Sequence, residues 1–546
     1  MTLRGEQLLP FFGLAYAIWT IASAPQWTVD DAYILFRYAE NWVATGIPAW
    51  NPGQPPVEGY TGTLYLALLA AAHAIGFPLE PTAKAIGIFA YTLTGFLVWL
   101  ILRQLGIRPL VQGLACLLYF SAAFLFPHAL SGLETTVFVA LLTLAVYLSL
   151  RAVDCQRLHT SIVTYLAFAL LAIARPEGML FAIALLCGLL LTPQRADSML
   201  HQLRRLGIRI ALFFGFPVAA VTLWRWSVYG DLLPNTYFAK VSVFGFSAGL
   251  SFLEFALQYW AALAVLVLVV AVPEWEQWTE ALRRRYQRFT PILIALGVAA
   301  LITLAEYSRS TLQMNYAHRF WAMLYPVGLS LTAFGVEQGL RTLETTALQR
   351  PLRFRRIQQI GLGLVVLQLL VHIGLWRWQE RKFLQDYQQL LQEEHARAAQ
   401  LLQQLVPPGV WIVVYPDAGL IPYQTKLPTI DGGRLNDRFL ARHQWRGVPG
   451  DSIILNYIFA HTPAAFVFKS GRDDRLLLNA EATAIVSDPR FDPYVLVASF
   501  RTQARRFAGR YFLLLYLHRS LVPSMATTPS TSPVTTSGEG GKDVQP

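Results

Sequence analysis

Apolar segments of near-membrane length alternate with short polar loops through the first 376 residues. The hydrocarbon core of a bilayer is about 30 Å thick, and roughly 20 apolar residues cross it as a helix. Segments of this kind predict about eleven transmembrane helices, at 8–25, 83–102, 110–127, 135–150, 161–174, 178–192, 208–227, 251–273, 290–306, 320–338 and 358–376. Segment 61–77 is apolar but short, and its pattern favours a re-entrant or interfacial helix.

Basic residues gather in alternate loops between these segments. The clearest examples are RRRYQR at 283–288 and RPLRFRR at 350–356. Lys and Arg collect in the cytoplasmic loops of membrane proteins. All these loops fall on one side of the membrane if the eleven segments cross and 61–77 does not. The pattern therefore predicts a multi-pass protein with a cytoplasmic N-terminus and an extracytoplasmic C-terminal region.

The pattern changes after residue 376. Segment 376–405 is polar with a helical apolar stripe, and Pro407-Pro408-Gly409 ends it. Short β-like runs follow at 411–415, 464–468, 494–500 and 511–517. These features predict a membrane module over 1–376, which includes an external loop over 26–82, and an extracytoplasmic α/β domain over 377–520. The tail, 521–546, is rich in Ser, Thr, Pro and Gly, which predicts disorder.

The composition supports this interpretation and excludes other classes of protein. The chain is 55% hydrophobic and only 14% charged, whereas soluble domains average roughly 25% charged residues. An ordinary cytosolic enzyme or a disordered chain is therefore excluded. The net charge of +11 is explained by basic cytoplasmic loops, so no nucleic-acid partner is expected. The sequence contains no Walker or HExxH motif, and the lack of a Walker motif counts against an ATP-driven pump.

Two adjacent carboxylates, Asp30 and Asp31, follow the first apolar segment directly. Neighbouring carboxylates raise each other's pKa, so one of them can serve as a general base. Their oxygens also suit a divalent cation. An Asp is equally a common N-cap, here for an amphipathic helix predicted over 31–44. The residues alone leave these alternatives open.

Further acids and bases fall on the same predicted external face. They are Glu58, Glu134, Arg175, Lys240 and Arg319. Arg175 is on the predicted external side, where the positive-inside rule disfavours a basic residue. It therefore requires an anion, which is either a ligand, a lipid headgroup or the nearby Glu177. Their convergence from distant loops indicates an ionic site at the external membrane boundary.

A purely structural alternative also exists for Glu134, Lys240 and Arg319. Glu134 follows Ser131 by three residues, the spacing of a helix capping box. Lys240 and Arg319 lie at helix ends, where long basic side chains commonly extend to the membrane interface. These alternatives stay open at the level of sequence.

An ordered set of motifs resembles one known family. After the Asp pair come AYILFRYA at 32–39, NPG at 51–53, VEGYT at 57–61, SGLET at 131–135, ARPEG at 174–178, GDLLPNT at 230–236, HRF at 318–320, DAGLIPY at 417–423 and IDGGRLND at 430–437. This order resembles the polyprenyl-phosphate-sugar glycosyltransferases of the GT-C superfamily, most of all the terminal arabinofuranosyltransferases. The resemblance implies a GT-C-like membrane fold.

The resemblance also implies an activity. A sugar would be transferred from a polyprenyl-phosphate donor to an envelope glycan, lipid or protein, on the outer face of a bacterial inner (plasma) membrane. Asp30 would be the base, Asp31 a metal ligand or an orienting group, and Glu134 a second acidic motif. The candidate cofactor is a divalent cation, Mg²⁺ or Mn²⁺.

The matched motifs supply further candidate site residues. Those for the donor and its phosphate are Arg175, Lys240, His318 and Arg319. Those for substrate binding are Tyr33, Arg37, Glu58 and Tyr60. The alternatives are a polytopic transporter or lipid flippase, and a non-catalytic scaffold in which the Asp pair only caps a helix. A transporter is expected to show internal repeats and charges at mid-membrane, whereas here the charges lie at segment ends.

Overall fold

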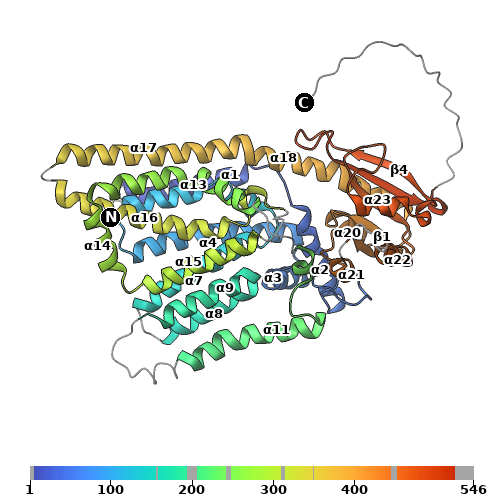
Figure 1. The fold of residues 1–546 in the computed structure, drawn as a ribbon, viewed down its shortest axis with the longest axis horizontal. Helices are drawn as coiled ribbons and strands as arrows, with labels where there is room; N and C mark the ends of the chain where they lie inside the picture. Colours follow the sequence, from blue (N-terminus) through green and yellow to red (C-terminus); the bar gives the residue numbers. More distant parts are fainter. Residues whose placement is uncertain are drawn as a thin grey trace, which may run out of the picture.

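The computed structural model describes residues 5–154, 158–192, 206–240, 247–308, 314–347, 350–443, 445 and 452–522. A bundle of helices forms the larger part, and a small sheet with its own helices lies at one end of it (Figure 1). This confirms the predicted fold class, a polytopic helical protein with a C-terminal α/β region. The tail predicted to be disordered lies outside the described residues from 523 onward.

Each of the eleven predicted apolar segments contains a helix. The helices of the bundle and its loops are α1 Leu9–Ala22, α2 Asp30–Thr45, α3 Thr63–Ala74, α4 Leu79–Gln104, α5 Pro109–Ser121, α6 Leu125–Leu130, α7 Thr135–Asp154, α8 Leu158–Ala174, α9 Pro176–Leu190, α11 Phe216–Tyr229, α12 Asn235–Lys240, α13 Ser247–Ala271, α14 Trp275–Tyr286, α15 Thr290–Tyr307, α16 Tyr325–Ala347 and α17 Pro351–Leu375. In Figure 1 most of the long ones run along the same axis.

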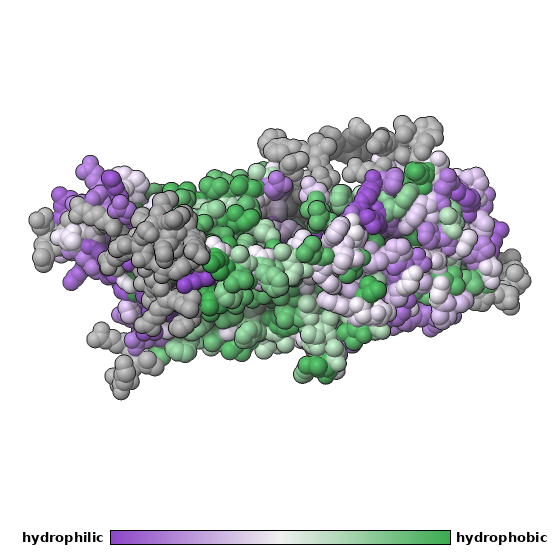
Figure 2. All heavy atoms as spheres, turned by 90° about the horizontal axis from the view of Figure 1, so that it is seen from below, coloured by the Kyte–Doolittle hydropathy of each residue, from purple (hydrophilic) through white to green (hydrophobic). Residues whose placement is uncertain are grey.

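Six helical stretches within the described residues are long and apolar enough to cross a membrane, judged by length and composition. They are Leu79–Gln104, Thr135–Val153, Leu206–Tyr229, Gly249–Glu280, Thr290–Tyr307 and Pro351–Leu405. Figure 2 shows the corresponding apolar band across the middle of the visible face, with hydrophilic residues gathered toward both ends. The protein is therefore a multi-pass membrane protein.

Two apolar segments depart from simple spans. The predicted span 110–127 is broken, because α5 ends at Ser121 and the chain turns before α6, every residue of which is buried. Helix α3 has 12 residues, about 18 Å of helix, which is too short for the hydrocarbon core. Its length agrees with the interfacial helix predicted for 61–77.

Helix α17 continues without a break past residue 376, where the sequence predicted a domain boundary. Two π-helical stretches join it to α18, Arg381–Leu390, and to α19, Arg397–Leu405. The continuous helix leads directly from the bundle into the sheet region (Figure 1). The division of the chain into separate domains stays a prediction.

The sheet has five strands in the order β2-β1-β3-β5-β4. They are β1 Ile412–Tyr415, β2 Thr429–Asp431, β3 Ala465–Ser470, β4 Tyr494–Arg501 and β5 Phe512–His518. β1 pairs in parallel with β2 and β3, placing Val413 opposite Ile430 and Phe466, whereas β5 is antiparallel to β3 and β4. All four predicted strands are confirmed. β2 was not predicted, because three residues give no periodic signal.

Alternate residues of the strands serve two hydrophobic cores, as the pleat requires. Val413 and Phe466 pack with the short helices α21 Arg438–Arg442, α22 Ser452–Ala460 and α23 Ala480–Ser487. Ile412 and Val467 belong instead to the core that is continuous with the bundle. The helix α20, Leu420–Thr425, lies on this second side and packs against α2 and α19.

Two side chains of α2 hold the sheet region against the bundle. The Asp30 carboxylate accepts hydrogen bonds from the backbone N–H groups of Gly419 at 2.9 Å and Leu420 at 2.8 Å. Asp30 thus caps α20. Its own helix, α2, has Val29 at the N-cap position and no side-chain cap. Arg37, 2% exposed, donates to the carbonyls of Pro422 and of Leu427.

We predict that Gly419→Ala loosens this junction. A Cβ atom at residue 419 would overlap the backbone carbonyl of Asp30. Overpacking of this kind costs roughly 1–3 kcal/mol, so the variant is expected to unfold at a lower temperature and to be cut faster between α19 and β1. Gly471→Ala is the control, because its nearest neighbour lies at an ordinary 3.5 Å. Equal stability of both variants would contradict the tight fit.

Candidate functional site

Five of the residues predicted for the site come together at one end of the bundle. They arrive from separate elements, at the beginning of α2, α7 and α9, at the end of α12, and ahead of α16; the residues are Asp31, Glu134, Arg175, Lys240 and Arg319. Helix ends suit such groups, since long apolar helices below them supply the rigid support. We call these five, together with Glu177, the ionic cluster.

Glu134 is the centre of the ionic cluster. Its Oε1 atom lies 3.3 Å from Arg319 Nη2 and 3.6 Å from Arg175 Nη1. Arg319 also donates to Thr135 Oγ1 at 3.3 Å. Glu134 is 3% exposed, and the two guanidinium groups replace the water that it loses. The capping-box alternative is not formed, because Ser131 Oγ accepts from Leu133 N instead.

Asp31 lies at the open side of the ionic cluster. Its carboxylate is 4.0 Å from Arg319 Nη1, and its side chain is 24% exposed. Lys240, which is partly buried, acts on Asp31 as a nearby positive charge. Asp31 is thus the carboxylate of the pair that both reaches the cations and remains accessible.

Arg175 sits between two carboxylates and two aromatic rings. Its Nη2 atom is 3.2 Å from Glu177 Oε1, an oxygen that also accepts from the Tyr307 hydroxyl. The guanidinium carbon lies 5.5 Å and 5.9 Å from the ring centres of Phe138 and Phe320. Its buried Nε has no hydrogen-bond partner among the described residues. One donor is therefore left for a ligand.

Burial and neighbouring charges shift the acids of this region in opposite directions. Burial raises the pKa of Asp31, with Asp417 and Glu134 adding to the effect, although Lys240 and Arg319 oppose it. Burial also opposes ionisation of Glu134, but Arg319 and Arg175 outweigh it and lower its pKa. Glu134 therefore stays a fixed anion, whereas Asp31 binds a proton more readily than an ordinary Asp.

Asp30 behaves differently from its neighbour. Burial, reinforced by Asp417, raises the pKa of Asp30 to about 8 despite its bonds to the two backbone N–H groups. Both its oxygens accept hydrogen bonds, from Gly419 N and from Leu420 N. The structure therefore places Asp30 at the junction with α20, rather than in the ionic cluster.

The four predicted substrate-binding residues all have partners within the protein. Arg37 contacts backbone carbonyls of the sheet region, and Tyr33 donates to Glu80 at 3.3 Å. Glu58 accepts two hydrogen bonds from Arg225, each of 2.7 Å. Tyr60 bonds the hydroxyl of Tyr229 at 2.8 Å. These contacts shape the external loop that carries Asp31.

His318, predicted for donor binding, is directed elsewhere. Its Nε2 atom lies 2.8 Å from Gln258 Oε1 on α13, and the residue has a positive φ of 54°. The turn it makes places the next residue, Arg319, in the ionic cluster.

Besides Glu177, two residues of the region were not predicted for the site. Tyr307 fixes Glu177, and Asp417, which is bonded by the Tyr511 hydroxyl at 2.5 Å, acts electrostatically on both Asp30 and Asp31. Asp417 lies in the DAGLIPY motif, so that motif was the available signal. A tyrosine near the end of an apolar helix gives none.

The residues around Asp31 do not fit a metal site. In the described part of the chain, no group of three or more His, Cys, Asp or Glu side chains is arranged to hold a metal ion. Two of the charged neighbours of Asp31 are the cations Lys240 and Arg319, which repel a divalent ion.

Comparison with known protein families and sequences adds two likenesses. Residues 381–516 match a domain of unknown function, DUF8728. A terminal beta-(1->2)-arabinofuranosyltransferase of Mycobacterium tuberculosis is 28% identical over 229 residues, 39% of this chain and 35% of that protein. The chain thus spans about a third of the length of the curated relative it matches.

Solved structures of ArnT from Cupriavidus metallidurans match nearly the whole chain. The apo form has a TM-score of 0.54 at 12% identity and covers 94% of this chain and 99% of ArnT. The form bound to undecaprenyl phosphate has a TM-score of 0.51 at 13% identity, with 96% and 99% covered. The GT-C resemblance predicted from the motifs is thereby confirmed for the fold. The chain is a multi-pass membrane protein that has the GT-C fold of ArnT.

Proposed function

We propose that the protein is a glycosyltransferase that moves a sugar from a polyprenyl-phosphate donor to an acceptor of the cell envelope. The observation that carries this proposal is the ionic cluster, in which a partly exposed carboxylate faces buried cations at the membrane boundary. Two likenesses support it: the similar relative is an arabinofuranosyltransferase, and ArnT was solved with undecaprenyl phosphate.

The cations of the cluster suit a phosphate leaving group. As the bond between sugar and phosphate breaks, the phosphate gains a negative charge, and charge-assisted hydrogen bonds are strongest for such groups. Arg175 has a buried Nε without a partner, and Lys240 and Arg319 lie close to Asp31. These three side chains are the proposed phosphate-binding residues.

Asp31 is the proposed general base. An acceptor hydroxyl is a weak nucleophile, and a carboxylate within reach can take its proton as it attacks. Asp31 is accessible, and its raised pKa suits it to receive that proton. Asp30 is proposed as a positioning residue, since its oxygens hold α20 and fix the start of the helix that carries Asp31. This reverses the roles that the resemblance alone implied.

The orientation of the protein is also part of the proposal. The basic loops at 283–288 and 350–356 lie at the ends of α14 and α17 opposite the ionic cluster. By the positive-inside rule these loops are cytoplasmic, so the cluster and the sheet region face outward. A transporter is not favoured, because the ionic cluster lies at helix ends rather than at mid-membrane.

We predict that Asp31→Asn abolishes sugar transfer while the protein stays folded. Removing a general base typically lowers the rate by about 100-fold to 10,000-fold. Purified variants are compared with radiolabelled polyprenyl-phosphate arabinofuranose as the first donor and an oligoarabinoside as acceptor. Asp492→Asn, a change at an exposed residue of the sheet region, is the control. Transfer at the native rate by Asp31→Asn would refute the proposed base.

We predict that Arg175→Ala raises the KM for the donor by about tenfold or more, because a buried charge-assisted contact with its phosphate is lost. Arg355→Ala, at an exposed position at the other end of the bundle, is expected to leave that KM unchanged. The KM values are measured at saturating acceptor. The same effect from both substitutions would count against a phosphate contact at Arg175.

We predict that a cysteine in the sheet region is labelled from outside the cell. An Asp473→Cys variant, at an exposed position, is expected to react with a membrane-impermeant maleimide in intact cells. Gln287→Cys, between α14 and α15, is expected to react only after lysis. Both variants are made after the native cysteines are replaced by serine. The reverse pattern would overturn the orientation.

A further inference from the structure

An apolar cavity of about 560 Å³ lies at the end of the bundle opposite the ionic cluster. Leu150, near the end of α7, lines it, and α7 begins next to Glu134; its 20 residues span about 30 Å. Thr290, the first residue of α15, also lines it, whereas Tyr307 at the other end of α15 bonds Glu177. The cavity is therefore remote from the proposed catalytic site.

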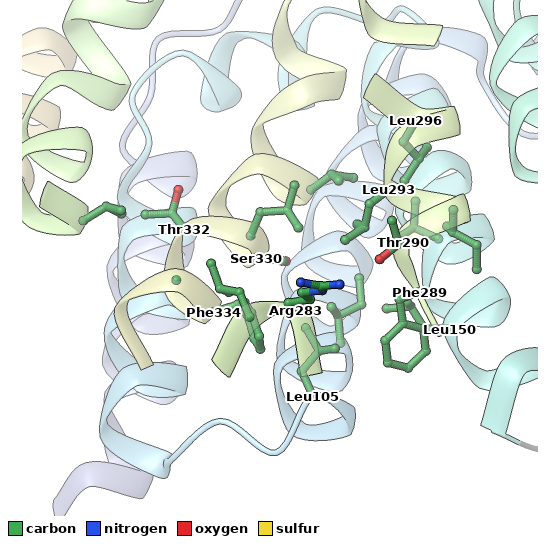
Figure 3. Close-up of a pocket in the computed structure, with 18 of the residues that line it drawn as sticks. Leu105, Leu150, Arg283, Phe289, Thr290, Leu293, Leu296, Ser330, Thr332 and Phe334 are labelled. Atoms are coloured by element: carbon green, nitrogen blue, oxygen red, sulfur yellow. The ribbon is translucent and has the colours of Figure 1, made fainter. Parts of the chain in front are cut away.

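One guanidinium group lies among the apolar side chains of this cavity. Figure 3 shows Arg283 surrounded by leucines and phenylalanines, with Thr290 on the same side of the cavity. Within the described residues, the guanidinium of Arg283 forms no hydrogen bond or ion pair, although its backbone carbonyl accepts from Gln287 N at 3.1 Å. Arg283 is exposed, so its guanidinium lies at the edge of the apolar cavity and is open to an anion.

Other arginines at this end of the bundle already have carboxylate partners. Arg108 and Arg341 both contact Glu337, at 3.0 Å and 2.6 Å. Arg353 lies 3.8 Å from Glu274. In the part of the chain that the structure describes, Arg283 differs from these three neighbours in having no carboxylate partner, and it differs from Arg103, which also has none, in lining the cavity.

A second apolar groove reaches the same arginine from the other side of α15. Its volume is about 760 Å³, and Arg283 and Thr290 line both hollows. The first cavity uses Leu293 of α15, whereas the second uses Ile294 and Val298, which are 61% and 49% exposed. The second groove therefore opens toward the surrounding lipid, and two apolar paths converge on one guanidinium.

We propose that this site binds one anionic diacyl phospholipid of the surrounding leaflet. Its phosphate would lie on Arg283, and its two acyl chains would follow the two hollows on either side of α15. The planar guanidinium matches phosphate geometry and is the preferred side chain for such recognition. A lipid with one chain would fill only one hollow, which is why the geometry favours two chains. The bound lipid would brace α14 against α15 and α16.

The proposal is tested by measuring lipid binding to the purified full-length protein. The probes are dioleoyl-phosphatidylglycerol, its single-chain lyso form, dioleoyl-phosphatidylcholine and glycerol phosphate, with dissociation constants from native mass spectrometry. We expect the first probe to bind at least about tenfold more tightly than each of the others, because only it supplies both the net charge and both chains. Equal binding of the lyso form or of glycerol phosphate would overturn the proposal.

Three variants locate the site. Arg283→Ala is expected to weaken phosphatidylglycerol binding about tenfold, as the loss of one charge-assisted contact implies. Arg103→Ala is the control, since Arg103 is exposed at the same end of the bundle and stacks on Trp99 outside the cavity. Val298→Trp fills the second groove without altering Arg283, and is expected to reduce diacyl binding to the level of the lyso form.

The outcomes are decisive even if one variant fails to fold. Unchanged phosphatidylglycerol binding in either Arg283→Ala or Val298→Trp would refute the site, and so would an equal loss in Arg103→Ala. Sugar transfer is not the readout, so failure of the proposed glycosyltransferase activity would leave this test unaffected.

Discussion

The contact on which the proposed site depends is the pair of guanidinium groups on Glu134. A buried carboxylate is tolerated only when charged partners replace its hydration, and Arg319 and Arg175 supply them at 3.3 Å and 3.6 Å. These partners come from segments that lie more than 40 residues and more than 180 residues away along the chain. Meeting the requirement of one carboxylate therefore brings the beginnings of α7 and α9 and the turn before α16 together. It also concentrates positive charge where a phosphate can use it.

The adjacent acids Asp30 and Asp31 show how one helix start can serve two purposes. Successive helical residues point about 100° apart, so the two carboxylates cannot face the same surroundings. Asp30 meets the backbone of α20, and Asp31 meets the cations. A carboxylate tied by two backbone N–H groups is a poor candidate to collect a proton from a substrate, because accepting one would disrupt those bonds. The tether instead makes the position of Asp31 depend on the sheet region, and so couples the two parts of the molecule.

The sequence was sufficient for features that repeat or are local. Apolar segments predicted the long helices of the bundle, and short β-like runs predicted four of five strands. The motifs also contained every member of the ionic cluster except Lys240, which lies four residues after the end of GDLLPNT. What could not be predicted was which neighbour each charged group meets. Glu58 is paired with Arg225, 167 residues away, and Asp30 with Gly419, 389 residues away. Such pairings follow from tertiary packing, and no spacing in the chain encodes them.

The charge balance of the ionic cluster connects these findings to the proposed reaction. Its cations Arg175, Lys240 and Arg319 are matched by the carboxylates Asp31, Glu134 and Glu177, so the buried group is close to neutral without a ligand. A polyprenyl-phosphate sugar carries one negative charge on its phosphate, and the released lipid phosphate carries two once the bond is broken. If Asp31 takes the proton of the acceptor hydroxyl, it loses one negative charge as the phosphate gains one. The total charge of the site then stays constant through the transfer, which matters because an added charge is expensive to hold at a buried position. The raised pKa of Asp31 favours uptake of the proton, and the cations around it stabilise the charge that the phosphate gains. The two features therefore act together to keep the charge of the site constant.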